Sequence, residues 1–196
     1  MVKYSLDLGQ KLKKPTKNCR ACGLYVNQPP VLEKSKKSQI FWVGLSAVRF
    51  EDGIEKLPLS PHTRSGALIE TVELPLRNKF LFYKTNLVKC LPLKEGKIRY
   101  PRSCEMEKCY TNFEEELEIS KPKVVFLLGK QVGLFVLKKY GFKNFTFDKN
   151  FEYESYELNN ITFIPVHHPS FILVYKRKNL NQYIQSLQKL CKEFLK

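Results

Sequence analysis

Six cysteines occur in the chain, and four of them are spread in a way that suits metal ligation better than disulfide bonds. Cys19 and Cys22 form a Cys-x-x-Cys pair near the start, and Cys90 and Cys109 follow singly, far along the chain. A pair plus two single thiols can clamp distant segments of one domain onto one ion or cluster, and thiolates bind both zinc and iron–sulfur clusters. Inert buried cysteines are the alternative, which a Cys-x-x-Cys pair alone does not exclude.

Two further groups of polar residues follow apolar runs. Asn86 lies in Thr-Asn-Leu-Val-Lys-Cys (85–90), and its amide offers a donor and an acceptor side by side, as recognition of a base edge requires. Local bonding of the asparagine to a strand end is the alternative. His167 and His168 lie in His-His-Pro-Ser (167–170), where an imidazole could donate to a developing negative charge or be purely structural.

Four short apolar runs, rich in β-branched and aromatic residues, predict the strands that position these groups: 40–45, 80–88, 123–129 and 161–166. Helices are predicted over 65–76, 104–119, 130–139 and in a terminal segment with Tyr183, Leu187, Leu190, Cys191 and Phe194 on one face. This alternation predicts a single domain over 1–196 with an α/β fold, a three-layer α/β/α sandwich around a central, mostly parallel sheet of about four strands. The aromatic, polar stretch 142–160 predicts an added hairpin or an irregular excursion.

The polar groups should meet at one edge of this sheet. In an open parallel sheet, ligands bind beyond the carboxyl ends of the strands. Residues 44–48 follow the first predicted strand, 86–90 close the second, Gly129 follows the third and 167–170 follow the fourth. We therefore expect the functional site at this edge.

The charge of the chain favours a polyanionic partner. Lys and Arg number 34 against 19 Asp and Glu, which gives a formal net charge of +15, and the excess is spread along the chain. A lysine-rich surface without a specific partner is the alternative. The first residues lack the apolar core of a signal peptide, and no apolar run is long enough to span a bilayer. We expect a cytoplasmic, monomeric protein with no membrane partner.

Several motifs in a fixed order give the chain a resemblance to the iron–sulfur uracil-DNA glycosylases, family 4 and family 5 of the uracil-DNA glycosylase superfamily. They are the Cys-x-x-Cys pair, VGLSAVRFEDG (43–53), RSGALIE (64–70), YKTNLVKCLP (83–92), RYPRSCEMEKC (99–109), KPKVVFLLGK (121–130) and HHPS (167–170). Most are weak signals individually, but their shared order over most of the chain is a strong one.

The resemblance implies that Cys19, Cys22, Cys90 and Cys109 ligate one [4Fe–4S] cluster, with zinc in the same thiolates as the runner-up. Cys109 is preferred over Cys104 because Glu105 precedes Cys109 by four residues, as in the family's Glu-x-x-x-Cys pattern.

The resemblance also implies roles at the strand ends. Asn86 would read the edge of a flipped base, and His168 would donate a hydrogen bond to O2 of the departing base. Ser170 would hold a DNA phosphate, and Lys176 and Arg177 would reach flanking phosphates or the groove.

Two departures from the family's pattern concern the water and the base. Family 4 enzymes usually read Gly-Glu-Ala-Pro-Gly where this chain has GLSAV (44–48), so the polar residue associated with water positioning is absent. Ser46 and Asp52 are the candidate catalytic residues here, and Gly44 and Leu45 are candidate base contacts. The segment KLPLSPHTRSG (56–66) lacks the phenylalanine that normally stacks on uracil and offers Pro61 and His62 in its place.

The resemblance thus implies a monofunctional DNA glycosylase that flips out a base, hydrolyses its N-glycosidic bond and leaves an abasic site. Uracil is the default substrate. A bulky or otherwise modified base is the alternative that the missing aromatic residue favours. A non-catalytic iron–sulfur module that binds DNA is a second alternative.

Overall fold

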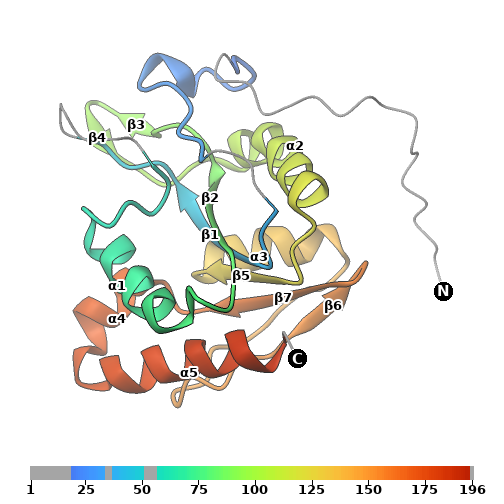
Figure 1. Cartoon of the computed structure of the whole chain (residues 1–196). Coiled ribbons are helices and arrows are strands. Elements are labelled where there is room, and N and C mark those ends of the chain that lie inside the picture. Colours follow the sequence, from blue (N-terminus) through green and yellow to red (C-terminus); the bar gives the residue numbers. More distant parts are fainter. Residues whose placement is uncertain (1–18, 34–36, 51–56, 195–196) are drawn as a thin grey trace.

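The structure is a computed structural model that describes residues 19–33, 37–50 and 57–194. Figure 1 shows strands at the centre of the molecule with helices on both sides. In chain order the elements are η1 (Leu24–Val26), β1 (Ile40–Ser46), α1 (Arg64–Glu73), η2 (Leu74–Leu76), β2 (Phe82–Val88), β3 (Leu93–Lys94), β4 (Lys97–Ile98), α2 (Ser103–Ser120), β5 (Val124–Leu128), α3 (Lys130–Lys139), β6 (Tyr156–Leu158), β7 (Ile161–Val166), α4 (Pro169–Tyr175), η3 (Arg177–Asn179) and α5 (Leu180–Glu193).

The main sheet has the strand order β2-β1-β5-β7-β6. The first four strands are parallel, which confirms the predicted mostly parallel sheet, and β6 pairs antiparallel with β7 as a fifth strand. This extra strand lies at the end of the stretch 142–160 and forms a hairpin with β7, whereas residues 142–155 form neither helix nor strand, as the irregular alternative expected. The chain moves outward from β1 to β2 and then crosses to β5 on the other side of β1. Such a reversal of strand order is where ligands bind in open α/β sheets.

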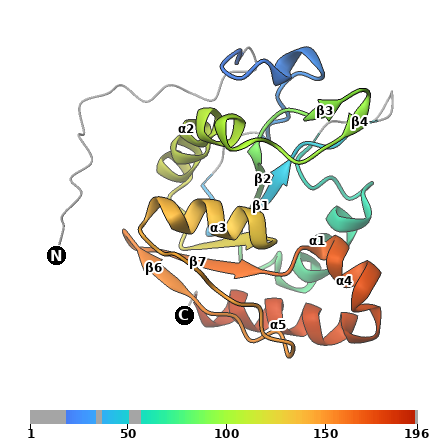
Figure 2. The same ribbon diagram turned by 180° about the vertical axis from the view of Figure 1, so that it is seen from behind.

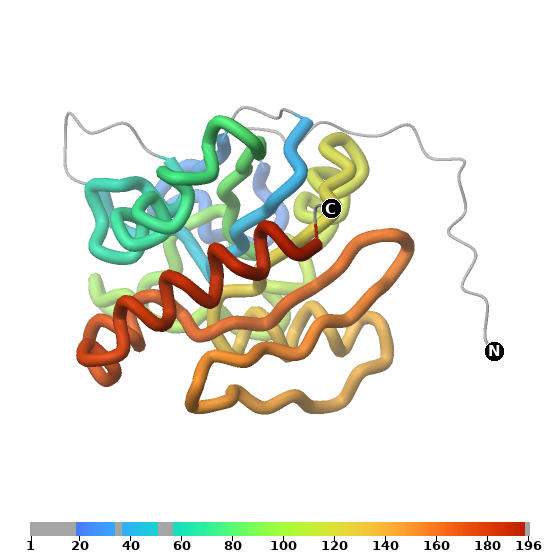
Figure 3. The backbone as a smooth tube through the Cα atoms, turned by 60° about the horizontal axis from the view of Figure 1, so that its bottom comes forward, coloured from blue at the N-terminus to red at the C-terminus, as the bar shows by residue number. Residues whose placement is uncertain are grey.

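Alternation of side chains along the buried strands explains the three layers. One face of the sheet packs against α1, α4 and α5 through a core that includes Trp42, Phe126 and Tyr183. The opposite face packs against α2 and α3 through a core that includes Phe41, Phe113 and Val136. Figure 2 shows α2 and α3 on their side of the sheet, and Figure 3 shows α5 lying across the other side. The predicted three-layer α/β/α arrangement is confirmed.

The predicted helices are present with small shifts at their ends. The segment 65–76 forms α1 and η2, 104–119 forms α2, and 130–139 forms α3. The predicted face of the terminal helix is also the packed one, since Tyr183, Leu187 and Cys191 are fully buried in α5. The short helix α4 and the β3–β4 hairpin were not predicted. Among the described residues, no helix is both long enough and apolar enough to cross a membrane.

The strand β2 lies at an edge of the sheet, so side chains must satisfy its outward-facing main-chain groups. The N–H of Lys84 donates to Oε2 of Glu33 at 2.9 Å, and the carbonyl of Asn86 accepts from Nζ of Lys89 at 2.7 Å. The amino-terminal segment packs near the carboxyl end of β2, because the N–H of Val31 donates to the carbonyl of Lys89 at 2.8 Å. This packing brings the Cys-x-x-Cys pair toward the end of β2.

Candidate active site and cysteine site

The carboxyl ends of the parallel strands bring the predicted active-site residues to one edge of the sheet. Gly44 of β1 pairs in register with Asn86 of β2. His168 follows β7 by two residues and caps α4, and Gly129 directly follows the neighbouring β5. Asn86 lies inside β2, two residues before its last residue, and not at the end of the strand as predicted.

The side chain of Asn86 lies over Gly44. A Cβ atom added to Gly44 would stand 2.3 Å from Oδ1 of Asn86 and 3.5 Å from Cδ2 of Leu59. The absence of a side chain on Gly44 therefore makes room for the amide, which is buried with only 4% of the residue exposed. The amide and an aliphatic side chain thus meet above the end of β1.

Leu59 was not singled out from the sequence. Its backbone is in the left-handed region with φ of 48°, which is uncommon for a residue that carries a side chain and marks a conformation held by its surroundings. No local sequence signal distinguishes this leucine from others, because tertiary packing determines both its φ and its contact with the Gly44 position.

The ring of His168 is held in a defined tautomer by Ser170. The main-chain N–H of Ser170 donates to Nδ1 of His168 at 3.1 Å, and Oγ of Ser170 lies 2.7 Å from the same nitrogen. Because an N–H can only donate, Nδ1 must accept, and the proton of the neutral ring is assigned to Nε2. Burial lowers the pKa of His168 from 6.5 to about 4, so the ring is neutral near pH 7.

Gly129 allows the close approach of His168 to the end of β5. Its φ is 96°, and a Cβ atom at this position would stand 3.2 Å from Cβ of His168. A residue with a side chain would be both strained and crowded there. The turn after β5 thereby helps to place the histidine.

The adjacent His167 has a different environment. It is buried, its ring centroid lies 4.4 Å from that of Phe147, and it stacks on Phe171 at 5.3 Å. Its Nδ1 is hydrogen bonded to the hydroxyl of Tyr153 at 2.9 Å, and its carbonyl accepts from the hydroxyl of Tyr183 at 2.8 Å. Burial also lowers the pKa of His167. These contacts give His167 a structural role within an aromatic cluster.

The remaining predicted residues belong to β1 and to the segments that follow it in the chain. Leu45 and Ser46 end β1 and are half-buried, whereas Asp52 lies outside the residues that the structure describes. His62 is exposed in the turn before α1, where its main-chain N–H is 3.4 Å from Oγ of Ser60. Thr63 caps α1 by accepting from the N–H of Gly66.

The four predicted cysteine ligands line one hollow. Cys19, Cys22, Cys90 and Cys109 border it together with Lys89 and Lys108. Cys90 and Cys109 are buried, and Cys19 and Cys22 are half-buried. Cys104 is exposed and is not among the residues that line the hollow, and Cys191 is buried in the core beneath α5.

The electrostatics of the hollow reflect the proximity of the thiols. Burial and the neighbouring Cys109, Cys22 and Cys19 raise the pKa of Cys90 to about 12. Burial raises the pKa of Cys109 as well, while the charge of Lys89 acts in the opposite direction. The main-chain N–H of Lys89 donates to Sγ of Cys109 at 3.4 Å.

The four thiols border one hollow without converging on a single point. Within residues 19–33, 37–50 and 57–194, no three His, Cys, Asp or Glu side chains converge as the ligands of a single metal ion do. Zinc requires its thiolates about 2.3 Å from one centre. The ligands of a four-iron cluster bind separate iron atoms around a larger body, and four thiols bordering one hollow beside two lysines fit this group.

Exposed basic and apolar side chains follow His168. Val174 and Tyr175 of α4 are 65% and 72% exposed, and Lys176, Arg177 and Lys178 after them are exposed as well. Ser170, at the start of α4, is also exposed. Cationic and aromatic side chains thus extend outward from the edge of the sheet that holds Asn86 and His168.

Sequence comparisons identify the family to which the chain belongs. The family model of the Uracil DNA glycosylase superfamily matches residues 21–191. The Type-4 uracil-DNA glycosylase of Archaeoglobus fulgidus is 26% identical over 183 residues, which cover 88% of this chain and 86% of that protein. The Type-4 uracil-DNA glycosylase of Sulfurisphaera tokodaii is 26% identical over 176 residues, which cover 86% of this chain and 77% of that protein. Because the family match extends from the Cys-x-x-Cys pair into α5, the chain belongs to the uracil-DNA glycosylase superfamily.

Proposed function

We propose that the protein is a monofunctional DNA glycosylase that flips uracil out of DNA, hydrolyses its N-glycosidic bond and leaves an abasic site. The observation that carries this proposal is the tautomer of His168. Its Nδ1 is occupied by Ser170, so Nε2 carries the proton, at the same edge of the sheet as the Asn86 amide. Membership of the superfamily and the Type-4 relatives support the same activity.

Asn86 is proposed to recognise the base. Its side-chain amide supplies one acceptor and one donor, and uracil offers the complementary N3–H and O4 on its Watson–Crick edge. Cytosine presents a donor where uracil has O4, so a fixed amide would reject it. The fit of the amide over Gly44 restricts its position, and recognition by one amide requires such a restriction.

His168 is proposed to stabilise the departing base. As the bond from N1 of uracil to C1′ of the sugar breaks, negative charge develops on the base and is shared with O2. A hydrogen bond from Nε2 of His168 to O2 would strengthen as this charge grows, and one such donor is typically worth about a hundredfold to a thousandfold in rate. The neutral ring donates this hydrogen bond while Nδ1 keeps its contact with Ser170.

Water must then add to C1′. Ser46, at the end of β1, and Asp52, which lies outside the described residues, are the proposed residues for this step. The hydroxyl of Ser46 can orient a water molecule by hydrogen bonding, and the carboxylate of Asp52 can in addition accept its proton. Gly44 and Leu45 would form the wall of the base pocket beside them.

DNA binding is proposed to use the exposed surface after His168. Ser170 would contact the phosphate next to the flipped nucleotide, and Lys176 and Arg177 would contact flanking phosphates. His62, exposed at the turn before α1, would approach the DNA from the side of β1. The net charge of +15 supports this assignment, because phosphate contacts supply most of the affinity of such proteins.

The cysteine hollow is proposed to hold one [4Fe–4S] cluster on Cys19, Cys22, Cys90 and Cys109, with zinc as the runner-up. The group would connect the amino-terminal segment to the end of β2 and to α2, and we assign it a structural role. A cluster held by four thiolates gives a brown protein with broad absorbance near 400 nm, whereas zinc gives a colourless one.

A modified base is the second candidate substrate, and Leu59 is the observation that favours it. Cδ2 of Leu59 and the Asn86 amide both border the Gly44 position, and the segment 56–66, to which Leu59 belongs, lacks the phenylalanine that normally stacks on uracil in the family. An aliphatic side chain has no flat face, so it can contact a base without requiring the base to lie parallel to it. It also leaves room for a substituent on the base.

A panel of oligonucleotides tests both candidates. Duplex and single-stranded DNA, each with one uracil, one cytosine or one modified pyrimidine, are incubated with the purified protein, and abasic sites are counted by strand cleavage in alkali. We expect cleavage at uracil and none at cytosine, with discrimination reduced in the Asn86→Ala variant. Cleavage at a modified base with none at uracil would establish the second candidate, and no cleavage at any base would contradict a glycosylase.

A further inference from the structure

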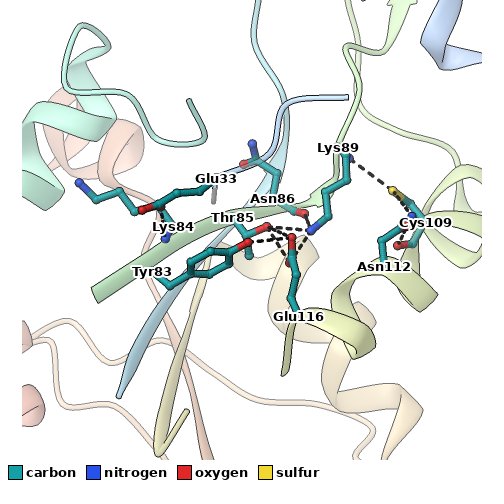
Figure 4. A network of polar contacts seen from close by, with 9 residues as sticks. All are labelled: Glu33, Tyr83, Lys84, Thr85, Asn86, Lys89, Cys109, Asn112 and Glu116. Carbon is teal, nitrogen blue, oxygen red and sulfur yellow. Dashed lines mark hydrogen bonds and ion pairs between the residues drawn. The ribbon is translucent and has the colours of Figure 1, made fainter. Parts of the chain in front are cut away.

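A buried ion pair lies between α2 and the end of β2, the strand that carries Asn86. Lys89 and Glu116 are only 2% and 1% exposed, and Nζ of Lys89 is 2.7 Å from Oε2 of Glu116. Figure 4 shows the lysine reaching from the end of β2 toward the carboxylate, with Asn86 and Thr85 around its ammonium group. Burial of two charges is costly unless each is paired and hydrogen bonded.

All three donors of the Lys89 ammonium are used. Besides Glu116, Nζ donates to Oγ1 of Thr85 at 2.7 Å and to the carbonyl of Asn86 at 2.7 Å. Glu116 in turn accepts from Thr85 at 2.8 Å and from the hydroxyl of Tyr83 at 3.2 Å. The network therefore fixes the direction of each of its members.

Stability of the fold alone does not account for this network. A buried ion pair can often be replaced by apolar residues of similar volume without loss of stability, whereas removal of one partner is strongly destabilising. Glu116 lies among apolar residues of α2, with Phe113 and Leu117 buried in the core on this side of the sheet. An apolar pair would suit this layer.

The distinctive feature of the network is its contact with Asn86. The carbonyl of Asn86 belongs to an edge strand, and Lys89 provides a hydrogen bond at this position. The side chain of the same residue lies over Gly44 on the opposite side of the strand from Thr85. The orientation of the Asn86 peptide therefore sets the direction in which its amide points.

We propose that Lys89, held in place by Glu116, is a positioning residue that fixes the main chain of Asn86 and thereby aims its amide at the base. The inference rests on the proposed function, since it assigns Lys89 an effect on the discrimination between bases. The main-chain N–H of Lys89 also donates to Sγ of Cys109, so Lys89 contacts both Asn86 and the cysteine site.

The test separates positioning from stability by removing both charges together. The single variant Lys89→Met leaves the Glu116 carboxylate buried without its cation and should melt at a lower temperature. The double variant Lys89→Met/Glu116→Leu has no buried charge at this place and should recover most of the lost stability. Under single turnover, the double variant should nevertheless excise uracil about tenfold more slowly than the wild type, with a lower ratio of uracil to cytosine excision. Its KM for DNA, measured in the steady state, should be unchanged.

A matched control is available on the same strand. Lys84 of β2 forms a 3.1 Å ion pair with the buried Glu73, and its main-chain N–H donates to Glu33, so within the described residues its polar contacts are directed away from Asn86. The double variant Lys84→Met/Glu73→Leu should change the melting temperature and leave the discrimination between uracil and cytosine at the wild-type ratio.

The proposal requires that Lys89 act through Asn86. In an Asn86→Ala background, the double variant Lys89→Met/Glu116→Leu should therefore add little further loss of uracil excision, because residues that act through one another are non-additive. A multiplicative further loss would overturn the inference, as would a stable double variant with wild-type rate and discrimination. A wild-type protein that excises no base would instead refute the proposed function, and that result is known before any variant is compared.

Discussion

Replacing Gly44 by Ala should disturb base recognition, because it adds one methyl group beneath the Asn86 amide. The added Cβ would stand 2.3 Å from Oδ1 of Asn86, and ordinary contacts begin at 3.4 Å. The amide must therefore retreat by about 1 Å. Its main chain is held by Lys89, so the retreat must come from rotation of the side chain.

The expected magnitude follows from this displacement. A misplacement of about 1 Å in a group that orients a substrate can cost about a hundredfold in rate. Overpacking of a buried site typically costs about 1–3 kcal/mol of stability. We therefore expect Gly44→Ala to excise uracil about a hundredfold more slowly under single turnover, to discriminate less between uracil and cytosine, and to melt at a modestly lower temperature.

A steric control separates these two effects. Gly133 in α3 is equally crowded, since a Cβ atom there would stand 2.6 Å from Cζ of Phe145. Gly133→Ala should destabilise the fold and leave the excision rate of the folded protein unchanged. If Gly44→Ala excised uracil at the wild-type rate and with the wild-type discrimination, the position assigned to the Asn86 amide would be refuted.

Three further predictions concern DNA binding, the cysteine site and the histidine. Lys176→Ala should weaken binding to all DNA sequences alike, and the slope of log affinity against log salt should become shallower by about 0.9. As a control, Lys123 is exposed just before β5, and Lys123→Ala should leave this slope unchanged. Equal slopes in the two variants would refute the assigned surface. Cys109→Ser should abolish absorbance near 400 nm and lower the melting temperature, whereas Cys104→Ser should do neither. Loss of the absorbance in Cys104→Ser, with none in Cys109→Ser, would give the fourth ligand to Cys104. His168 should titrate near pH 4 in NMR of histidine-labelled protein, because burial lowers its pKa. Its contribution to the free energy of unfolding should therefore be complete above pH 6.5 and be lost as the pH falls toward 4. A midpoint near 6.5 would refute the lowered pKa of this half-buried ring.

The fold was predictable because local patterns and tertiary structure agree over most of the chain. The runs around Trp42 and Phe126 are apolar on both faces, as strands buried between two helical layers must be. The strand β6 was less visible, because it has only three residues and is half-exposed. The helix α4 was missed since its seven residues are too few to show a helical period, although Pro169 at its first position is a typical start.

The site was predictable where spacing carries the information and not where packing does. The order of the motifs pointed to Asn86, His168 and the cysteines, which the fold brings to one sheet edge and one hollow. The family resemblance favoured His168 over the adjacent His167, whereas the aromatic cluster around His167 is built from distant segments and leaves no local signal. Lys89 and its partner Glu116 are 27 residues apart, so no local pattern reveals that they pair.

Single-turnover excision of uracil by the His168→Ala variant tests the central claim most directly. The variant removes the proposed donor to O2 together with the side-chain cap of α4, while the proposed phosphate contacts of Lys176 and Arg177 remain. Its affinity for uracil-containing DNA should therefore stay close to that of the wild type while base release slows by about a hundredfold or more. Binding is measured by fluorescence anisotropy on the same oligonucleotide. A His168→Ala protein that excises uracil at the wild-type rate would contradict the account, because the His-His-Pro-Ser turn would then be only structural.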